Sequence, residues 1–226
     1  MLTLHRADAL LTGRGADPLP GGAVLVDGGR ITAVGPYEEL GARAPQARVR
    51  RWPGLLTPGL VLHGARELLE EAYHPDGQFE ADRLGTEPIT GAAELAALGL
   101  TEARRGNSAR RATQKLLARG VVAVAGRLTV PAVRTAVARS GLELLPPAAG
   151  GAAPGVSGVS GARRAVSADP FEGLADVREA FHGVVAAGGP ARFAVFAAAG
   201  AGSLREAGSA ACVATVIGGR LLHRRR

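Results

Sequence analysis

Residues 24–35 read VLVDGGRITAVG, and this stretch decides the fold of the N-terminal part of the chain. Two aliphatic runs, Ala23–Val26 and Ile31–Val34, lie on either side of an Asp-Gly-Gly-Arg segment. Asp-Gly and Gly-Gly pairs supply the positive φ angles that a tight turn between antiparallel strands requires. The stretch therefore predicts a β-hairpin, and we expect further strands at Ala9–Leu11 and Val49–Trp52.

The C-terminal part of the chain has the same pattern. Phe193–Phe196 is an expected strand, and Cys212–Ile217 and Arg220–His223 lie on either side of two glycines, which predicts a second hairpin. Two-stranded pieces are marginally stable in water, so we expect both ends to share one small β-domain. The predicted domains are residues 1–60 plus 190–226 and, inserted between them, residues 61–189.

The inserted part changes from strand to helix patterning. A helix capped by Asn107 or Ser108 is expected to bury Ala109 and Leu116 and to stop at Gly120, before an apolar strand. The pattern recurs from Thr129 and Pro131 to Gly141 and the run at residues 142–145. Two helix–strand units in series predict an α/β layer. A further helix is expected at residues 92–98 and a flexible loop at about 146–168.

Composition limits the function classes. The net charge is +7, but the arginines are scattered and aromatic residues make up 4% of the chain, so we expect no specific nucleic-acid partner. No apolar stretch approaches the roughly 20 residues of a membrane span. Cys212 is the single cysteine and is expected to be a buried thiol. These features, with no signal-peptide pattern, predict a cytoplasmic protein.

Three stretches carry a resemblance to a known family. Residues 24–35, the phrase LTPGLV at residues 56–61 and the closing hairpin at residues 211–222 resemble metal-dependent amidohydrolases, most closely the imidazolonepropionase-like branch. In that superfamily both chain ends build a β-sandwich called the composite domain, and a (β/α) barrel between them holds a metal. The resemblance implies a mixed α+β or α/β fold, with a composite β-sandwich and a truncated barrel-like insertion.

The metal motif of the family is incomplete in this sequence. In the family, the Pro-Gly phrase leads into His-x-His, whose imidazoles bind the metal; here His63 is followed by Ala65 at the second position. A catalytic zinc needs three protein ligands and a water. A full barrel takes about 200 residues or more, and the insertion is much shorter. We therefore expect no cofactor and no unaided metal-dependent catalysis.

One cluster of acidic and imidazole side chains still resembles a site. If residues 65–73 are helical, Glu70 and His74 lie on one face at i and i+4. The candidate metal ligands are His63, His74 and Glu70, and the competing interpretation is a solvated acidic helix; no catalytic residue is assigned. The whole cluster consists of His63, Glu67, Glu70, Glu71, His74 and Asp76.

The sequence leads to one functional prediction and two alternatives. The prediction is a divergent amidohydrolase-family protein, by resemblance a hydrolase of non-peptide C–N bonds, that acts as an accessory or binding module. The first alternative is a reduced hydrolase that completes a zinc or iron site within an oligomer. The second is a basic nucleic-acid-binding protein. Open strand edges predict a homo-oligomer or a heteromeric protein partner, and a small-molecule ligand is a further expected partner class.

Overall fold

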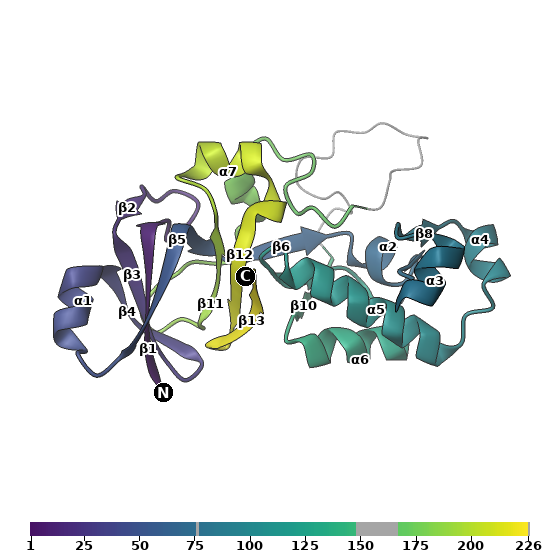
Figure 1. The fold of residues 1–226 in the computed structure, drawn as a ribbon, viewed down its shortest axis with the longest axis horizontal. Coiled ribbons are helices and arrows are strands. Elements are labelled where there is room, and N and C mark those ends of the chain that lie inside the picture. The colour runs from purple at the N-terminus through teal and green to yellow at the C-terminus, as the bar shows by residue number, and fades with distance from the viewer. Residues whose placement is uncertain (76, 148–166, 226) are drawn as a thin grey trace. The chain divides into compact units, whose positions relative to one another are not determined.

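The computed structural model describes residues 1–75, 77–147 and 167–225. These residues form two compact units (Figure 1). The first unit comprises Met1–Val61, Leu117–Val122 and Asp169–Arg226, and the second comprises Leu62–Leu116 and Ala123–Ala168. No helix among the described residues is both long and apolar enough to cross a membrane.

An eight-stranded sheet forms the first unit, in the order β13-β12-β11-β5-β1-β3-β4, with β2 paired to β1. Its strands come from both ends of the chain, which Figure 1 draws in purple to blue and in green to yellow. Their bounds are β1 (Leu2–Leu10), β2 (Leu19–Pro20), β3 (Gly22–Asp27), β4 (Arg30–Pro36), β5 (Arg48–Pro58), β11 (Arg192–Phe196), β12 (Cys212–Ile217) and β13 (Arg220–Arg224).

The strand β5 joins the two ends. It pairs in parallel with β1, where His5 lies opposite Arg50, and antiparallel with β11, where Val195 lies opposite Leu56. A register shift between Ala7 and Ala9 interrupts the β1–β5 ladder, and such irregularities bend a strand. This confirms the expected composite β-domain built from both chain ends.

Side chains from across the sheet form one core, so the sheet folds over on itself. The turns of the two hairpins meet, because a Cβ atom on Gly29 would lie 3.5 Å from the Gly218 oxygen. The Gly29 carbonyl also accepts a hydrogen bond of 2.8 Å from the amide of Ala191. The largest buried members of this core are Leu10, Val24, Val26, Ile31, Trp52, Leu56, Val185, Phe193, Val195 and Val216.

A second, smaller core lies under the helix α1 (Tyr37–Arg43). Leu40 of this helix is buried and packs with Leu4 of β1 and Leu25 of β3. Pro36 precedes the helix with φ of −58°. Acidic residues occupy the first turn, where their negative charge interacts favourably with the positive end of the helix dipole. The hairpin β3–β4 thus has side chains packed on both of its faces.

Besides the two ends of the chain, the first unit also contains internal segments. The amide of Val185 donates to the carbonyl of Thr12, and the amide of His182 donates to the carbonyl of Gly59, both at 2.8 Å. The hydroxyl of Thr215 donates to the carbonyl of Leu117 at 2.6 Å. Residues 169–189 and 117–122, which the sequence analysis assigned to the insertion, therefore lie with the β-domain. This unit also holds α7 (Ala201–Ala207), η1 (Val177–Ala180) and η2 (Ser209–Ala211).

Short strands and helices alternate through the rest of the chain. A three-stranded sheet has the order β10-β9-β6, and β10 is parallel to β9. The strands are β6 (Leu60–His63), β9 (Val121–Ala125), β10 (Glu143–Leu145) and a separate pair, β7 (Ala72–Tyr73) and β8 (Ile89–Thr90). The helices are α2 (Ala65–Leu69), α3 (Gly77–Leu84), α4 (Ala92–Ala97), α5 (Glu102–Leu117) and α6 (Pro131–Ser140).

The two expected helix–strand units are present. Ala109, Ala112 and Leu116 of α5 and Val133 and Val137 of α6 are buried. Glycines with positive φ, 81° at Gly120 and 83° at Gly141, follow the two helices. The alternation of helix and strand confirms the α/β character of this part of the chain. The loop expected at about 146–168 falls mostly on residues 148–166, which lie outside the described residues.

The predicted start of α5 was wrong. The helix begins at Glu102, so Asn107 and Ser108 lie within it and do not cap it. Thr101 is the capping residue, because its hydroxyl accepts the amide hydrogen of Arg104 at 3.3 Å. The glycine at position 106 does not break the helix, since a single helical glycine costs only about 1 kcal/mol relative to alanine.

Candidate functional site

Glu70 caps a helix. The helix α2 ends at Leu69, and β7 pairs with β8 just beyond it, so the i, i+4 geometry predicted for Glu70 and His74 was wrong. One carboxylate oxygen of Glu70 accepts the amide hydrogens of Thr129 and Val130 at 2.6 and 2.7 Å. The other accepts the Thr129 hydroxyl at 3.1 Å. Both oxygens are therefore engaged at the N-terminus of α6.

His74 is buried beside the middle of α5. Its Nε2 lies 3.0 Å from the carbonyl oxygen of Leu68, so the neutral ring carries its hydrogen on Nε2. Its backbone amide donates to the Ser108 hydroxyl at 2.8 Å, and its carbonyl accepts from the guanidinium of Arg111. Burial, followed by the positive charges of Lys115 and Arg111, lowers the pKa of His74, while its bond to Leu68 opposes the shift. The imidazole is therefore neutral at physiological pH.

The other members of the predicted cluster do not share one site. His63 ends β6 and is partly exposed, and Glu67 is exposed on α2. Glu71 makes an ion pair with Arg66 at 2.8 Å, with both side chains about half exposed. Asp76 lies outside the described residues. The structure thus gives Glu70, Glu71 and His74 separate structural partners.

The donor set does not fit the metal that the family resemblance implies. Nδ1 of His74 is buried and has no hydrogen-bond partner among the described residues, so one imidazole lone pair is available. Around it, however, the described part of the chain offers no group of three or more His, Cys, Asp or Glu side chains that could hold an ion. A catalytic zinc needs three such ligands.

A polar cluster next to His74 was missed by the sequence analysis. The Tyr73 hydroxyl donates to the Glu80 carboxylate at 2.6 Å, and Arg104 forms a 3.0 Å ion pair with the same carboxylate. Arg104 also donates to the Tyr73 hydroxyl at 3.2 Å. Burial, followed by the hydrogen bond to Glu80, raises the pKa of Tyr73. The phenol stays protonated, and these contacts fix α3 against β7 and α5.

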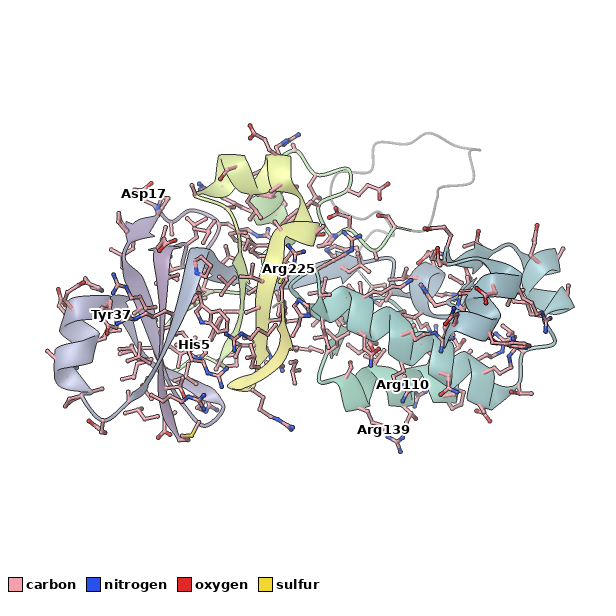
Figure 2. The ribbon with its side chains drawn as sticks, in the orientation of Figure 1. His5, Asp17, Tyr37, Arg110, Arg139 and Arg225 are labelled. Carbon is pink, nitrogen blue, oxygen red and sulfur yellow. The ribbon has the colours of Figure 1, made fainter. Side chains whose placement is uncertain are left out.

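The first unit buries a second histidine. Nδ1 of His5 accepts the indole hydrogen of Trp52 at 3.1 Å, and the His5 ring meets Phe193 edge to face at 4.9 Å (His5 is labelled in Figure 2). Burial, followed by the charge of Arg50, lowers the pKa of His5 to about 4. A neutral imidazole that accepts the indole hydrogen of Trp52 within a core fits a packing role.

The thiol of Cys212 is unsuited to nucleophilic catalysis. The side chain is buried in β12, and burial raises its pKa to about 11. The thiolate is the reactive form of cysteine, and it is scarce at neutral pH when the pKa is this high. The structure thus supports the expected buried thiol.

The class of architecture is a β composite domain that both chain ends build, with short α/β units between its parts. The family model described as "Imidazolonepropionase-like composite domain, bacteria" matches residues 22–47, which contain β3, β4 and α1. This match confirms the resemblance to the imidazolonepropionase-like branch of the amidohydrolases. No curated protein matches the chain.

Several solved structures are similar to this chain at low identity. The ochratoxinase of A. niger is 16% identical with a TM-score of 0.44, over 64% of this chain and 30% of its own. The E. coli guanine deaminase is 17% identical with a TM-score of 0.46, over 65% and 36%. The guanine deaminase of Bradyrhizobium japonicum is 16% identical with a TM-score of 0.43, over 65% and 34%. The chain spans about a third of the length of each.

Proposed function

We propose that this protein is a divergent, imidazolonepropionase-like member of the amidohydrolases that acts as an accessory or binding module. By resemblance its relatives hydrolyse non-peptide C–N bonds, and this chain lacks unaided metal-dependent catalysis. One observation carries the proposal. Glu70, the carboxylate among the candidate ligands, uses both oxygens on the amides and hydroxyl at the start of α6.

The chemistry of the remaining donors supports the same conclusion. Hydrolysis in this superfamily depends on a metal that activates water, and the metal must be held by several ligands at once. His63 has no second imidazole at position 65, and the Nε2 atom of His74 already donates to Leu68. A lone Nδ1 atom binds a divalent ion too weakly for this task.

Metal analysis and activity together test the proposal. The protein is purified without a histidine tag, its zinc, iron and manganese are measured, and cyclic amides and amino-substituted heterocycles are assayed with each metal added. We expect substoichiometric metal and no turnover. Stoichiometric metal that disappears in His74→Ala, together with chelator-sensitive hydrolysis, would overturn the proposal and favour the reduced-hydrolase alternative.

We also propose a homo-oligomer or a heteromeric protein partner as part of this function. The strand β10 lies at the end of the β10-β9-β6 order, and its Leu144 is 42% exposed. Exposed edge strands with apolar side chains are sites of further pairing. Light scattering of the purified chain tests this, and a strict monomer that binds no hydrophobic dye and captures no partner contradicts it.

The cytoplasm is the proposed location. Cys212 is a free, buried thiol and the single cysteine of the chain, so no disulfide can form within it. Proteins of reducing compartments have this character. Fractionation of the source cells tests the location, and recovery outside the cytoplasmic fraction contradicts it.

A further inference from the structure

A groove of about 670 Å³ lies between the helices α5 and α6 of the second unit. We call it the α5–α6 groove. Its lining includes Ala103, Gly106 and Arg110 on α5 and Ala132, Ala136 and Arg139 on α6. Small-molecule sites in proteins usually measure about 300–1,000 Å³ and are lined mostly by carbon, with a few polar groups that fix orientation. The α5–α6 groove has this size and this lining.

The groove is separate from the core that holds the helices in place. Ala109 and Ala112 of α5 and Val133 and Val137 of α6 are buried on the core side. The lining positions 103, 106, 107 and 110 follow one helical stripe of α5, and 132, 135, 136 and 139 follow one of α6. Small side chains at most of these positions leave room between the two stripes.

Gly106 of α5 and Ala132 of α6 face each other across this groove. A Cβ atom on Gly106 would lie 3.4 Å from the Cβ atom of Ala132, which is ordinary contact. Larger side chains at these two positions would therefore fill the space that a ligand needs. These two residues form an apolar part of the lining, which we call the Gly106–Ala132 floor.

Positive charge exceeds negative charge in the lining of the groove. Figure 2 shows Arg110 on α5 and Arg139 on α6, and both side chains are exposed. Among the described residues, neither guanidinium has an ion pair. Glu102 is the single acidic residue in the lining, so the groove has an excess of positive charge. Guanidinium groups bind carboxylates through paired, charge-assisted hydrogen bonds.

We propose that the α5–α6 groove binds a small amphiphilic carboxylate. Its hydrocarbon part packs on the Gly106–Ala132 floor, and its carboxylate is bound by Arg110 and Arg139. Asn107 and Gln114 of the lining supply neutral hydrogen-bonding groups beside them. The proposal does not depend on whether the chain hydrolyses any substrate.

Three probes separate the contributions of charge and hydrocarbon. The full chain, labelled with ¹⁵N, is titrated with octanoate, with acetate and with octanol, and amide shifts are followed by NMR. We expect saturable shifts with octanoate at Gly106, Ala132 and their neighbours, and much weaker effects with the other two probes. Octanoate shifts that do not saturate, that centre elsewhere in the molecule, or that octanol reproduces equally overturn the proposal.

Substitutions provide the matched controls. Arg110→Gln and Arg139→Gln each remove one charge-assisted pair and are expected to raise the Kd for octanoate about tenfold. Arg134→Gln removes the same charge from an exposed position of α6 outside the lining, and it should leave the Kd unchanged. Ala132→Leu fills the floor and should abolish binding. An equal effect of Arg134→Gln would show general charge attraction and refute the site.

Discussion

The carboxylate of Glu70 binds Thr129 through both its backbone amide and its side-chain hydroxyl, across a sequence separation of 59 residues. Val130 donates its amide to the same carboxylate, so the two residues just before α6 receive a negatively charged cap from a distant segment. Capping side chains satisfy amide groups that have no partner within the helix. A negative charge at this end also interacts favourably with the helix dipole. Glu70 therefore fastens α6 to the segment that follows α2.

Removal of this cap should destabilise the second unit. We expect Glu70→Ala to lower the free energy of unfolding by about 1–2 kcal/mol, because Thr129 and Val130 lose their acceptor. Glu71→Ala is the matched control. It removes an ion pair whose side chains are about half exposed, and should cost roughly 0–0.5 kcal/mol. Urea unfolding followed by circular dichroism at the helical band measures both; equal effects would contradict the capping role.

Acid should weaken the first unit through His5. Its folded pKa of about 4 lies below the ordinary value of 6.5, so the unfolded chain binds the proton more readily. Stability is then complete above about pH 6.5 and falls as the pH drops toward 4, by about 2–3 kcal/mol. Trp52, the single tryptophan, bonds to this ring and reports its unfolding by fluorescence.

The variant His5→Gln isolates the contribution of this histidine. Its amide oxygen can still accept the indole hydrogen of Trp52, but it does not titrate. We expect the loss of stability between pH 7.5 and pH 4.5 to be smaller in this variant than in the parent chain. An unchanged pH dependence would assign the effect to other histidines, such as His223, whose pKa is also lowered by burial.

The contact between the two hairpin turns should be intolerant of a methyl group. A Cβ atom on Gly219 would lie 1.8 Å from the Gly28 oxygen, at a φ of +72°. Gly218 has a similar φ of +58° but nothing within 4 Å of its Cβ position. Gly218→Ala should cost about 1–2 kcal/mol for the backbone conformation alone. Gly219→Ala should cost roughly a further 1–3 kcal/mol for the collision.

Thermal unfolding of both alanine variants, followed by the fluorescence of Trp52, measures this difference. The clash arises between a turn from the N-terminal part of the chain and one from the C-terminal part. A larger effect at Gly219 therefore shows in solution that the two hairpins meet. Equal melting temperatures for the two variants would contradict that contact.

The Cys212 thiol should be inert until the first unit unfolds. Its side chain is buried and its pKa is raised to about 11, so both access and thiolate content are low. We expect an aromatic disulfide reagent at pH 8 to label the chain only in denaturant, with one thiol released per chain. Rapid labelling of the native protein would place this strand outside the core.

The hairpins could be predicted because their determinants are local. The Gly28-Gly29 and Gly218-Gly219 turns and the flanking aliphatic runs specify strand, turn and strand within about a dozen residues. The order of the strands could not be predicted from local patterns, because β5 pairs with β11, which lies far along the chain. The sequence predicted that both ends share one β-domain, but it did not predict which strands pair.

The candidate site could be predicted less well, because its contacts are distant in sequence. Glu70 meets Thr129, and the amide of His74 meets Ser108, so neither partner appears in any local pattern. The helical spacing of Glu70 and His74 was a reasonable inference from composition. Pairing of β7 with β8 overrode it and turned the chain out of the helix at Leu69.

The position of β5 between β1 and β11 has a consequence for how the protein is made. While a ribosome synthesises residues 62–191, the N-terminal strands precede β11, so β5 has no β11 to pair with. Apolar side chains such as Leu55 and Leu56, which are buried in the complete fold, are then not yet fully buried. Partly formed sheets with open edges are prone to aggregation during synthesis. Slow translation of the insertion would therefore prolong an aggregation-prone state. Chaperones that bind nascent chains would be needed most before β11 is synthesised.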